Sequence, residues 1–180
     1  MKERQFFLPL HKKAREATPF DHIDINWNPH GHEPEMVYGL PHFDFHFYKI
    51  SRSEQLSIVP GPLMDLLPPP GAVPPTYVPT PGGVPQMGKH WIDFTSPELS
   101  PVNPKIFTKT FIYGSYNGKV IFEEPMITLA VLQRGRSSST NIPQPQVFLP
   151  ANTYYPTVYN ISLNSKSEKH IVTLSDFIYR

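Results

Sequence analysis

Residues 107–129 read FTKTFIYGSYNGKVIFEEPMITL, and this stretch decides the fold class. Two runs rich in β-branched and aromatic residues, 107–116 and 119–132, flank the dipeptide Asn117-Gly118. Asn-Gly between such runs is typical of a two-residue type I′ turn, in which both residues take positive φ angles. The stretch therefore predicts an antiparallel hairpin. The predicted pairs are Tyr116 with Lys119, Tyr113 with Phe122, and Phe111 with Glu124.

Further strands are predicted on both sides of this hairpin by alternating polar and apolar residues. These strands cover residues 21–27, 42–50, 157–163 and 170–178. The best helical candidate is short, Lys12 to Ala17, and ends at Thr18-Pro19 because a residue before proline avoids the helical region. Residues 135–141 are predicted to form a polar loop. The fold class is therefore mainly β, with antiparallel sheets and little helix.

Residues 60–85 form a proline-rich segment that contains ten of the chain's 23 prolines. Such a segment cannot hold a helix or enter the interior of a sheet. Its apolar side chains, among them Leu63, Leu66 and Tyr77, are anchors that a solvated linker would lack. We expect a long extended arm that lies on the domain or on a neighbouring subunit.

The totals exclude several classes of protein. The chain has 180 residues, which favours one β-rich domain over 1–180 with the proline-rich arm inside it. Its 16 Lys and Arg against 15 Asp and Glu include no basic run, so we expect no nucleic-acid partner. No apolar stretch approaches the roughly 18 residues of a membrane span. There is no Cys, so disulfides and thiolate metal ligands are excluded.

Several long motifs resemble a family of uncharacterised bacterial proteins, a domain of unknown function. Its structurally known member is a stress protein of a thermophile controlled by a sigma-E/anti-sigma-E pair. The motifs are DINWNPHGHEPEMVYGLPHFDFHFY (24–48), VPQMGKHWIDFTSPEL (84–99), FTKTFIYGSYNGKVIFEEPMITL (107–129) and YYPTVYNISL (154–163). The resemblance runs in order from about Phe7 to Arg180, so it covers nearly the whole chain.

This resemblance implies a β-rich fold of unusual topology and subunits that assemble as homo-oligomers, and it supplies no activity. Members usually carry a further N-terminal segment and often an export signal. The sequence begins Met1-Lys2-Glu3-Arg4, without the apolar core of a signal peptide. We expect a periplasmic or secreted protein if a leader has been removed, and a cytoplasmic one otherwise.

The residues best suited to chemistry lie in the motif His42-Phe43-Asp44-Phe45-His46. On a strand, alternate side chains share a face and follow one another at about 6.5–7 Å. His42, Asp44 and His46 should therefore project together, while the phenylalanines anchor the opposite face in a core.

One metal ion could be held on this platform if another strand supplies a third ligand. The expected ligands are His42, His46 and His90 with the carboxylates of Glu124 and Asp44. The loop His30-Gly31-His32-Glu33-Pro34-Glu35 supplies a second, weaker set, namely His30, His32 and Glu35. Imidazoles and carboxylates together suit a divalent metal, zinc first, with iron, manganese and copper as other choices.

Two metal-free interpretations of the same histidines stay open. They could form a structural hydrogen-bonded cluster in which Asp44 orients its neighbours and Glu124 pairs with a Lys or Arg across a subunit contact. They could also form an acid–base site without metal. Nucleophilic catalysis and nucleotide binding have no support, because the chain has no Cys, no Gly-x-Ser-x-Gly and no phosphate-binding glycine loop.

Two functions follow from these observations. The first is a homo-oligomeric stress or envelope-associated protein that binds a metal through the histidine and carboxylate cluster. The alternative is a metal-dependent hydrolase or lyase, with His42, His46 and His90 as ligands and Glu124 as base or fourth ligand. An open coordination position favours the enzyme, and a closed one favours the binding protein.

Overall fold

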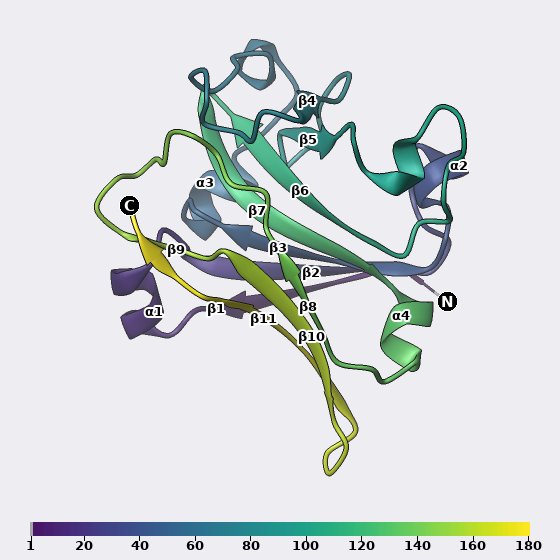
Figure 1. Cartoon of the computed structure of the whole chain (residues 1–180). Coiled ribbons are helices and arrows are strands. Elements are labelled where there is room, and N and C mark those ends of the chain that lie inside the picture. The colour runs from purple at the N-terminus through teal and green to yellow at the C-terminus, as the bar shows by residue number, and fades with distance from the viewer. Residues whose placement is uncertain (1) are drawn as a thin grey trace.

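The predicted turn forms at Asn117-Gly118, with φ angles of 48° and 72°, in the computed structural model, which describes residues 2–180. Tyr116 pairs with Lys119 across the turn, as predicted. The chain is mainly β, as expected, and its strands pair antiparallel in three sheets (Figure 1).

The largest sheet has seven strands in the order β1-β2-β3-β7-β6-β5-β4. These strands are β1 (Arg4–Pro9), β2 (His22–Asn28), β3 (His42–Tyr48), β4 (Tyr77–Pro79), β5 (Lys89–Asp93), β6 (Lys109–Tyr116) and β7 (Lys119–Thr128). A three-stranded sheet contains β8 (Ser138–Asn141), β10 (Val158–Asn164) and β11 (Lys169–Ser175), and a two-stranded one pairs β9 (Tyr154–Tyr155) with β12 (Ile178–Tyr179).

The helices are short and lie at the margins of the sheets. The α-helices are α1 (Lys12–Ala17), α2 (Glu35–Tyr38), α3 (Arg52–Leu56) and α4 (Leu129–Gln133), and the 3-10 helices are η1 (Pro62–Met64) and η2 (Pro97–Leu99). The predicted helix at Lys12–Ala17 is confirmed. No helix within residues 2–180 has the length and apolar character needed to cross a membrane.

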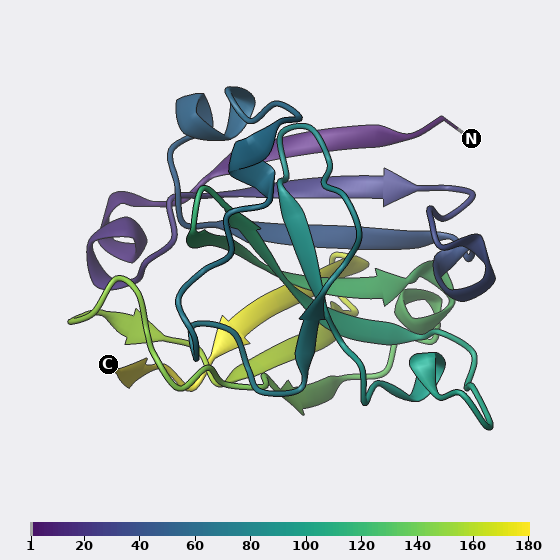
Figure 2. The same cartoon turned by 90° about the horizontal axis from the view of Figure 1, so that it is seen from above.

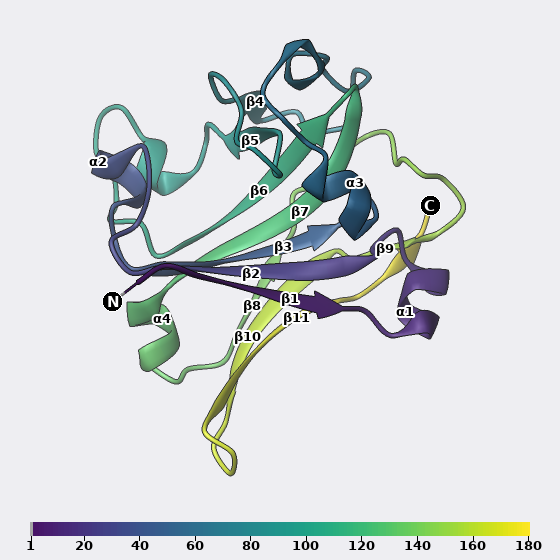
Figure 3. The same cartoon turned by 180° about the vertical axis from the view of Figure 1, so that it is seen from behind.

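The large sheet is strongly curled. Seen from above, β4 and β5 cross the direction of β1, β2 and β3 instead of continuing beside them (Figure 2). In Figures 1 and 3, β7 and β6 lie between these two parts of the sheet and connect them. The sheet therefore has a concave face, which looks toward β4 and β5, and a convex face, which packs on β8, β10 and β11 (Figure 3).

Each face has its own apolar core. On the convex face, Phe111 and Ile127 of the large sheet pack against Tyr159 and Ile161 of β10. The core of the concave face includes Tyr48, Ile112, Phe122 and Met126, covered by side chains from α2 and η1, namely Tyr38 and Met64. The candidate ligands lie on this concave face, so they sit among buried side chains.

The predicted register of the hairpin holds only near its turn. Pairing shifts by one residue between Gly114 and Ser115. The expected pairs Tyr113 with Phe122 and Phe111 with Glu124 are therefore wrong, and the observed pairs are Tyr113 with Glu123 and Phe111 with Pro125. An extra residue in one strand moves every later pair by one place. The sequence of the turn does not predict such a shift.

Two element boundaries also differ from the expectation. The strand predicted over 119–132 ends at Thr128, whose side chain accepts a hydrogen bond from the Val131 N–H and caps α4. The polar loop predicted over 135–141 contains β8, which pairs with β10. Ser138–Asn141 forms an edge strand without apolar residues, so alternation could not identify it.

The proline-rich arm follows the domain closely. Its strand β4 is the last strand of the large sheet, an edge position that tolerates proline. The side chains of Met64, Ala72 and Tyr77 are buried. The backbone carbonyls of Leu63 and Leu66 accept hydrogen bonds from the N–H groups of Asn117 and Gly118. The arm is thus fixed over the hairpin turn.

Candidate metal centres

Strand β3 presents His42, Asp44 and His46 on the concave face, where all three are buried. Phe43 and Phe45 point the other way and pack into the core of the convex face. The predicted alternation of the two sets is confirmed. The polar side chains are held rigidly because the phenylalanines between them anchor the strand.

The most buried candidate group contains His46, His90 and Glu124. The His46 Nε2 atom lies 3.4 Å from Glu124 Oε1, and the His90 Nε2 atom lies 3.9 Å from Glu124 Oε2. One donor atom from each residue lies within 4.8 Å of the others, which is compact enough for a single ion. The three residues come from β3, β5 and β7, so the curl of the sheet creates this group.

The surroundings of Glu124 differ from those of the adjacent Glu123, although both side chains are buried. Glu123 points to the other side of β7 and pairs with the Lys49 Nζ atom at 2.8 Å. Among residues 2–180, no Lys or Arg forms an ion pair with Glu124, and its Oε2 atom has no hydrogen-bond partner. A buried carboxyl group without a partner is costly unless it is protonated or bound to a cation.

Burial sets the protonation states of this group in the absence of a cation. Burial, followed by repulsion from Asp44, raises the pKa of Glu124 well above its usual range. Burial lowers the pKa of His46, against the opposing charges of Asp44 and Asp24. Burial and then His46 lower the pKa of His90 to about 3. Both imidazoles are thus neutral at pH 7, as metal ligands must be.

The His46 ring has no hydrogen bond at either nitrogen within residues 2–180. Besides Glu124, the ring lies close to two aromatic side chains, with Phe122 edge-on at 4.9 Å and Tyr48 stacked at 5.8 Å between centroids. A fully buried imidazole normally satisfies at least one nitrogen. His46 Nε2 is therefore available to a ligand, and the neighbouring Glu124 Oε2 atom also has no hydrogen-bond partner in the described part of the chain.

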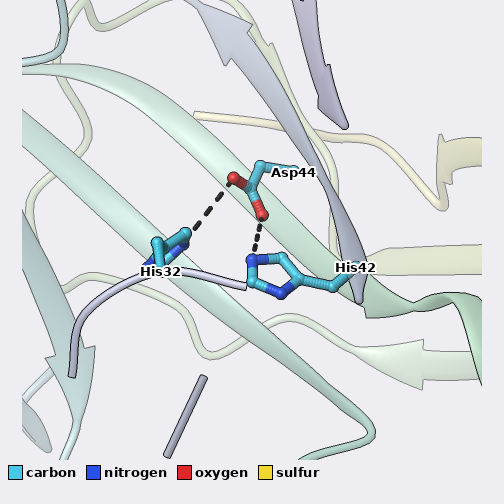
Figure 4. Close-up of side chains that lie close together, drawn as sticks. All are labelled: His32, His42 and Asp44. Atoms are coloured by element: carbon cyan, nitrogen blue, oxygen red, sulfur yellow. Dashed lines mark ion pairs between the residues drawn. The ribbon is translucent and has the colours of Figure 1, made fainter. Parts of the chain in front are cut away.

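A second group lies on the same strand and contains His32, His42 and Asp44. The two oxygens of Asp44 face different rings, with Oδ1 3.1 Å from His42 Nε2 and Oδ2 3.7 Å from His32 Nε2 (Figure 4). Burial alone would raise the pKa of Asp44, but the adjacent imidazoles, His42 first, outweigh it and lower that pKa. Asp44 is therefore an anion, unlike Glu124.

The structure distributes the predicted ligands over these two groups. We expected His42, His46 and His90 to meet at one point, whereas His42 stands with Asp44 and His46 stands with His90 and Glu124. His32, which the sequence offered only as a weaker candidate, completes the group of His42. His30 and Glu35 are exposed and belong to neither group.

The sequence could not show that His32 is a stronger candidate than His30, because the conformation of a loop determines where its side chain lies. Gly31 has a φ angle of 70°, and a Cβ atom there would lie 2.1 Å from the Tyr38 carbonyl oxygen. The His32 N–H donates to that same carbonyl at 3.2 Å. This close approach folds residues 29–33 onto α2 and turns His32 toward Asp44. A glycine between two histidines signals such a turn but not its direction.

No protein-family model, curated protein or solved structure matches this chain. A function for the chain must therefore be inferred from the geometry of the two groups.

Proposed function

We propose that this protein binds a divalent metal ion, zinc by the chemistry of its ligands, through His46, His90 and Glu124. The observation that carries the proposal is the buried carboxyl group of Glu124, which faces two imidazole nitrogens and has an oxygen without a hydrogen-bond partner. A cation at this point would satisfy all three side chains at once.

Two imidazoles and one carboxylate are a ligand set that zinc uses in proteins, with Zn–N distances of about 2.0–2.1 Å and Zn–O distances of about 2.0–2.2 Å. The low pKa values of His46 and His90 keep the required lone pairs free at neutral pH. The metal competes only with the proton on Glu124, which it displaces on binding. The buried group is therefore prepared for a cation.

In its wider role we propose a homo-oligomeric stress or envelope-associated protein of the uncharacterised bacterial family that its motifs resemble. The resemblance of the motifs at 24–48, 84–99 and 107–129 supports membership, and the same motifs contain both candidate groups. The exposed leucines of the proline-rich arm support self-association.

The alternative is a metal-dependent hydrolase or lyase that uses the same cluster. It is favoured by the number of ligands, because three protein ligands leave the fourth position of a tetrahedral zinc ion for water or substrate. Binding of a small anion to the metal-loaded protein, such as azide to the Co²⁺ form, would favour the enzyme. Unchanged Co²⁺ absorption on adding azide would favour the binding protein.

Metal analysis of the full chain tests the buried centre. Protein purified without chelator and then equilibrated with Zn²⁺ should hold zinc, and His90→Ala should hold one equivalent fewer than the parent. His170→Ala is the matched control, since His170 is an exposed histidine of β11 outside both groups. A parent protein that binds no zinc, or a His90→Ala variant that binds as much as the parent, contradicts the proposal.

A further inference from the structure

We propose that His32, His42 and Asp44 form a second metal site, distinct from the buried centre, which takes a divalent ion that exchanges with solvent. This inference does not depend on the proposed function, because the two groups share no ligand. It rests on hydrogen bonds that determine where each imidazole carries its proton.

The Nδ1 atom of each ring faces a backbone carbonyl. His42 Nδ1 lies 2.7 Å from the Leu40 oxygen, and His32 Nδ1 lies 2.8 Å from the Glu33 oxygen. A carbonyl oxygen can only accept a hydrogen bond, so both Nδ1 atoms must donate. In the neutral rings the lone pair is therefore on Nε2 in both residues.

The Nε2 atoms of both rings lie beside the carboxylate of Asp44 (Figure 4). A lone pair and a carboxylate oxygen repel each other, so the 3.1 Å between His42 Nε2 and Asp44 Oδ1 requires either a proton on Nε2 or a metal ion beside the two atoms. Both atoms are buried and have no hydrogen-bond partner within residues 2–180. One metal ion coordinated by the two Nε2 atoms and the carboxylate removes the conflict.

Hydrogen bonds and packing hold the three side chains of this group in place. A metal-bound imidazole usually donates its other N–H to a carbonyl or carboxylate, which is the arrangement of both His32 and His42. Asn28 donates to Asp44 Oδ2 at 2.6 Å and fixes the carboxylate from the neighbouring strand β2. His42 also packs edge-on against Phe107, with 5.5 Å between centroids, which holds its ring plane.

The two sites are separate centres. The two groups share no ligand, and Asp44 and His46 occupy alternate positions of the strand, about 7 Å apart, so each group would hold its own ion. They also differ in access. The His32 side chain is 40% exposed, whereas His46 and Glu124 are at most 2% exposed. The site of His32 is therefore open to water and small anions and should exchange its metal faster.

Zinc stoichiometry and release distinguish the two sites. After treatment with chelator and equilibration with Zn²⁺, the full chain should hold two equivalents, and His32→Ala should hold one. His30→Ala is the matched control, an exposed histidine of the same loop that belongs to neither group. Transfer of zinc to a coloured chelator should be biphasic, and His32→Ala should remove the fast phase alone.

Several outcomes would overturn this inference. One is a His32→Ala variant that keeps the zinc stoichiometry and both phases of zinc release of the parent. It would mean that the imidazoles are protonated and pair with Asp44 without a metal ion. A second outcome is a parent that holds one equivalent of zinc, which His90→Ala loses and His32→Ala keeps. That result would support the buried centre and contradict the site of His32. A single equivalent lost in His32→Ala and kept in His90→Ala would support this site and contradict the proposed function.

Discussion

At the scale of single residues, His22 and His46 show how a structural histidine differs from a candidate ligand. Both are buried on the same face of neighbouring strands. His22 uses both nitrogens, with Nδ1 2.9 Å from Asp21 and Nε2 2.7 Å from Gln55. His46 uses neither within residues 2–180. His22 is thus a structural histidine with both nitrogens engaged, whereas His46 Nε2, which faces Glu124, is free of such a partner among the described residues.

Glu124→Gln should abolish zinc binding at the buried centre and stabilise the metal-free protein at neutral pH. The raised pKa of Glu124 means that the folded state keeps a proton that the unfolded state releases as pH rises. The stability that this carboxyl contributes is fully present below its ordinary pKa of about 4.3 and is lost as pH rises through the folded value. Glutamine does not titrate, so the variant does not lose this stability as pH rises.

Thermal unfolding of both metal-free proteins between pH 5 and pH 8 checks this expectation. The difference in Tm should grow in favour of Glu124→Gln as pH rises, and added Zn²⁺ should stabilise the parent more than the variant. A variant less stable than the parent by the same margin at every pH would show that Glu124 is charged and satisfied by the protein itself.

Alternation along one strand was sufficient to predict which residues of β3 share a face, because the period of a strand is two. It could not predict that His42 and His46 serve different groups. That division depends on His32 from a loop and His90 from a strand two places beyond β7 in the sheet. Neither relation is local in sequence.

At the scale of elements, the middle of β6 determines the shape of the buried centre. His90 lies opposite Gly114, and Gly114 lies opposite Phe122. A Cβ atom at Gly114 would lie 2.0 Å from the Phe122 ring, so the missing side chain makes room for that ring. The ring in turn contacts both imidazoles, with centroids 4.9 Å from His46 and 5.4 Å from His90.

Gly114→Ala should therefore destabilise the protein by about 1–3 kcal/mol, the usual cost of overpacking a core, and weaken zinc binding at the buried centre. Denaturant unfolding and zinc titration measure the two effects. A second substitution, Phe122→Leu, makes room for the new methyl group and should recover part of the lost stability. Unchanged stability and affinity in Gly114→Ala would show that the ring does not position the ligands.

Gly31→Ala should remove the fast-exchanging zinc and leave the buried equivalent in place. The new Cβ atom would meet the backbone of Tyr38 at 2.1 Å, so the loop must move away from α2 and take His32 with it. Gly82→Ala is the matched control, because Gly82 has a similar φ angle of 71° and no atom within 4 Å of the new Cβ. Loss of fast-exchanging zinc in both variants would indicate general strain instead.

The boundaries of elements could be predicted where a local signal fixes them. The Asn117-Gly118 turn and the helix before Thr18-Pro19 both formed as expected. The shift at Gly114 and the strand β8 were missed because each depends on a partner strand. Register irregularities of this kind arise from packing against neighbours and leave no periodic signal.

At the scale of the whole molecule, the curl of the large sheet places both candidate centres on the concave face, among buried side chains. It brings β5 over β3, so ligands from distant segments meet on the concave face (Figure 2). The convex face is closed by β8 and β10. The sequence predicted strands and an antiparallel arrangement, but the curl depends on how seven strands pack together, which composition and periodicity do not encode.

The proline-rich arm leaves a set of leucines exposed on this molecule. Leu63, Leu66 and Leu67 are 42%, 50% and 52% exposed. The backbone of Leu63 and Leu66 is tied to the hairpin turn, so these side chains stand on a fixed surface. Apolar side chains grouped on a rigid surface mark contact sites between proteins. The prolines restrict the conformations of this arm, because they fix φ and remove N–H donors. The arm nevertheless holds one turn of 3-10 helix, η1, where a proline stands at the first position.

We therefore expect a homo-oligomer in which this arm contributes contact area. Light scattering at micromolar concentration should give a mass above the 20.6 kDa of one chain. The double substitution Leu66→Glu and Leu67→Glu should shift it toward the monomer, because each charge would lose its hydration in the contact. Val102→Glu is the control, since Val102 is 91% exposed outside the arm. A monomer mass for the parent, or an unchanged oligomer in the double variant, would remove the arm from any subunit contact.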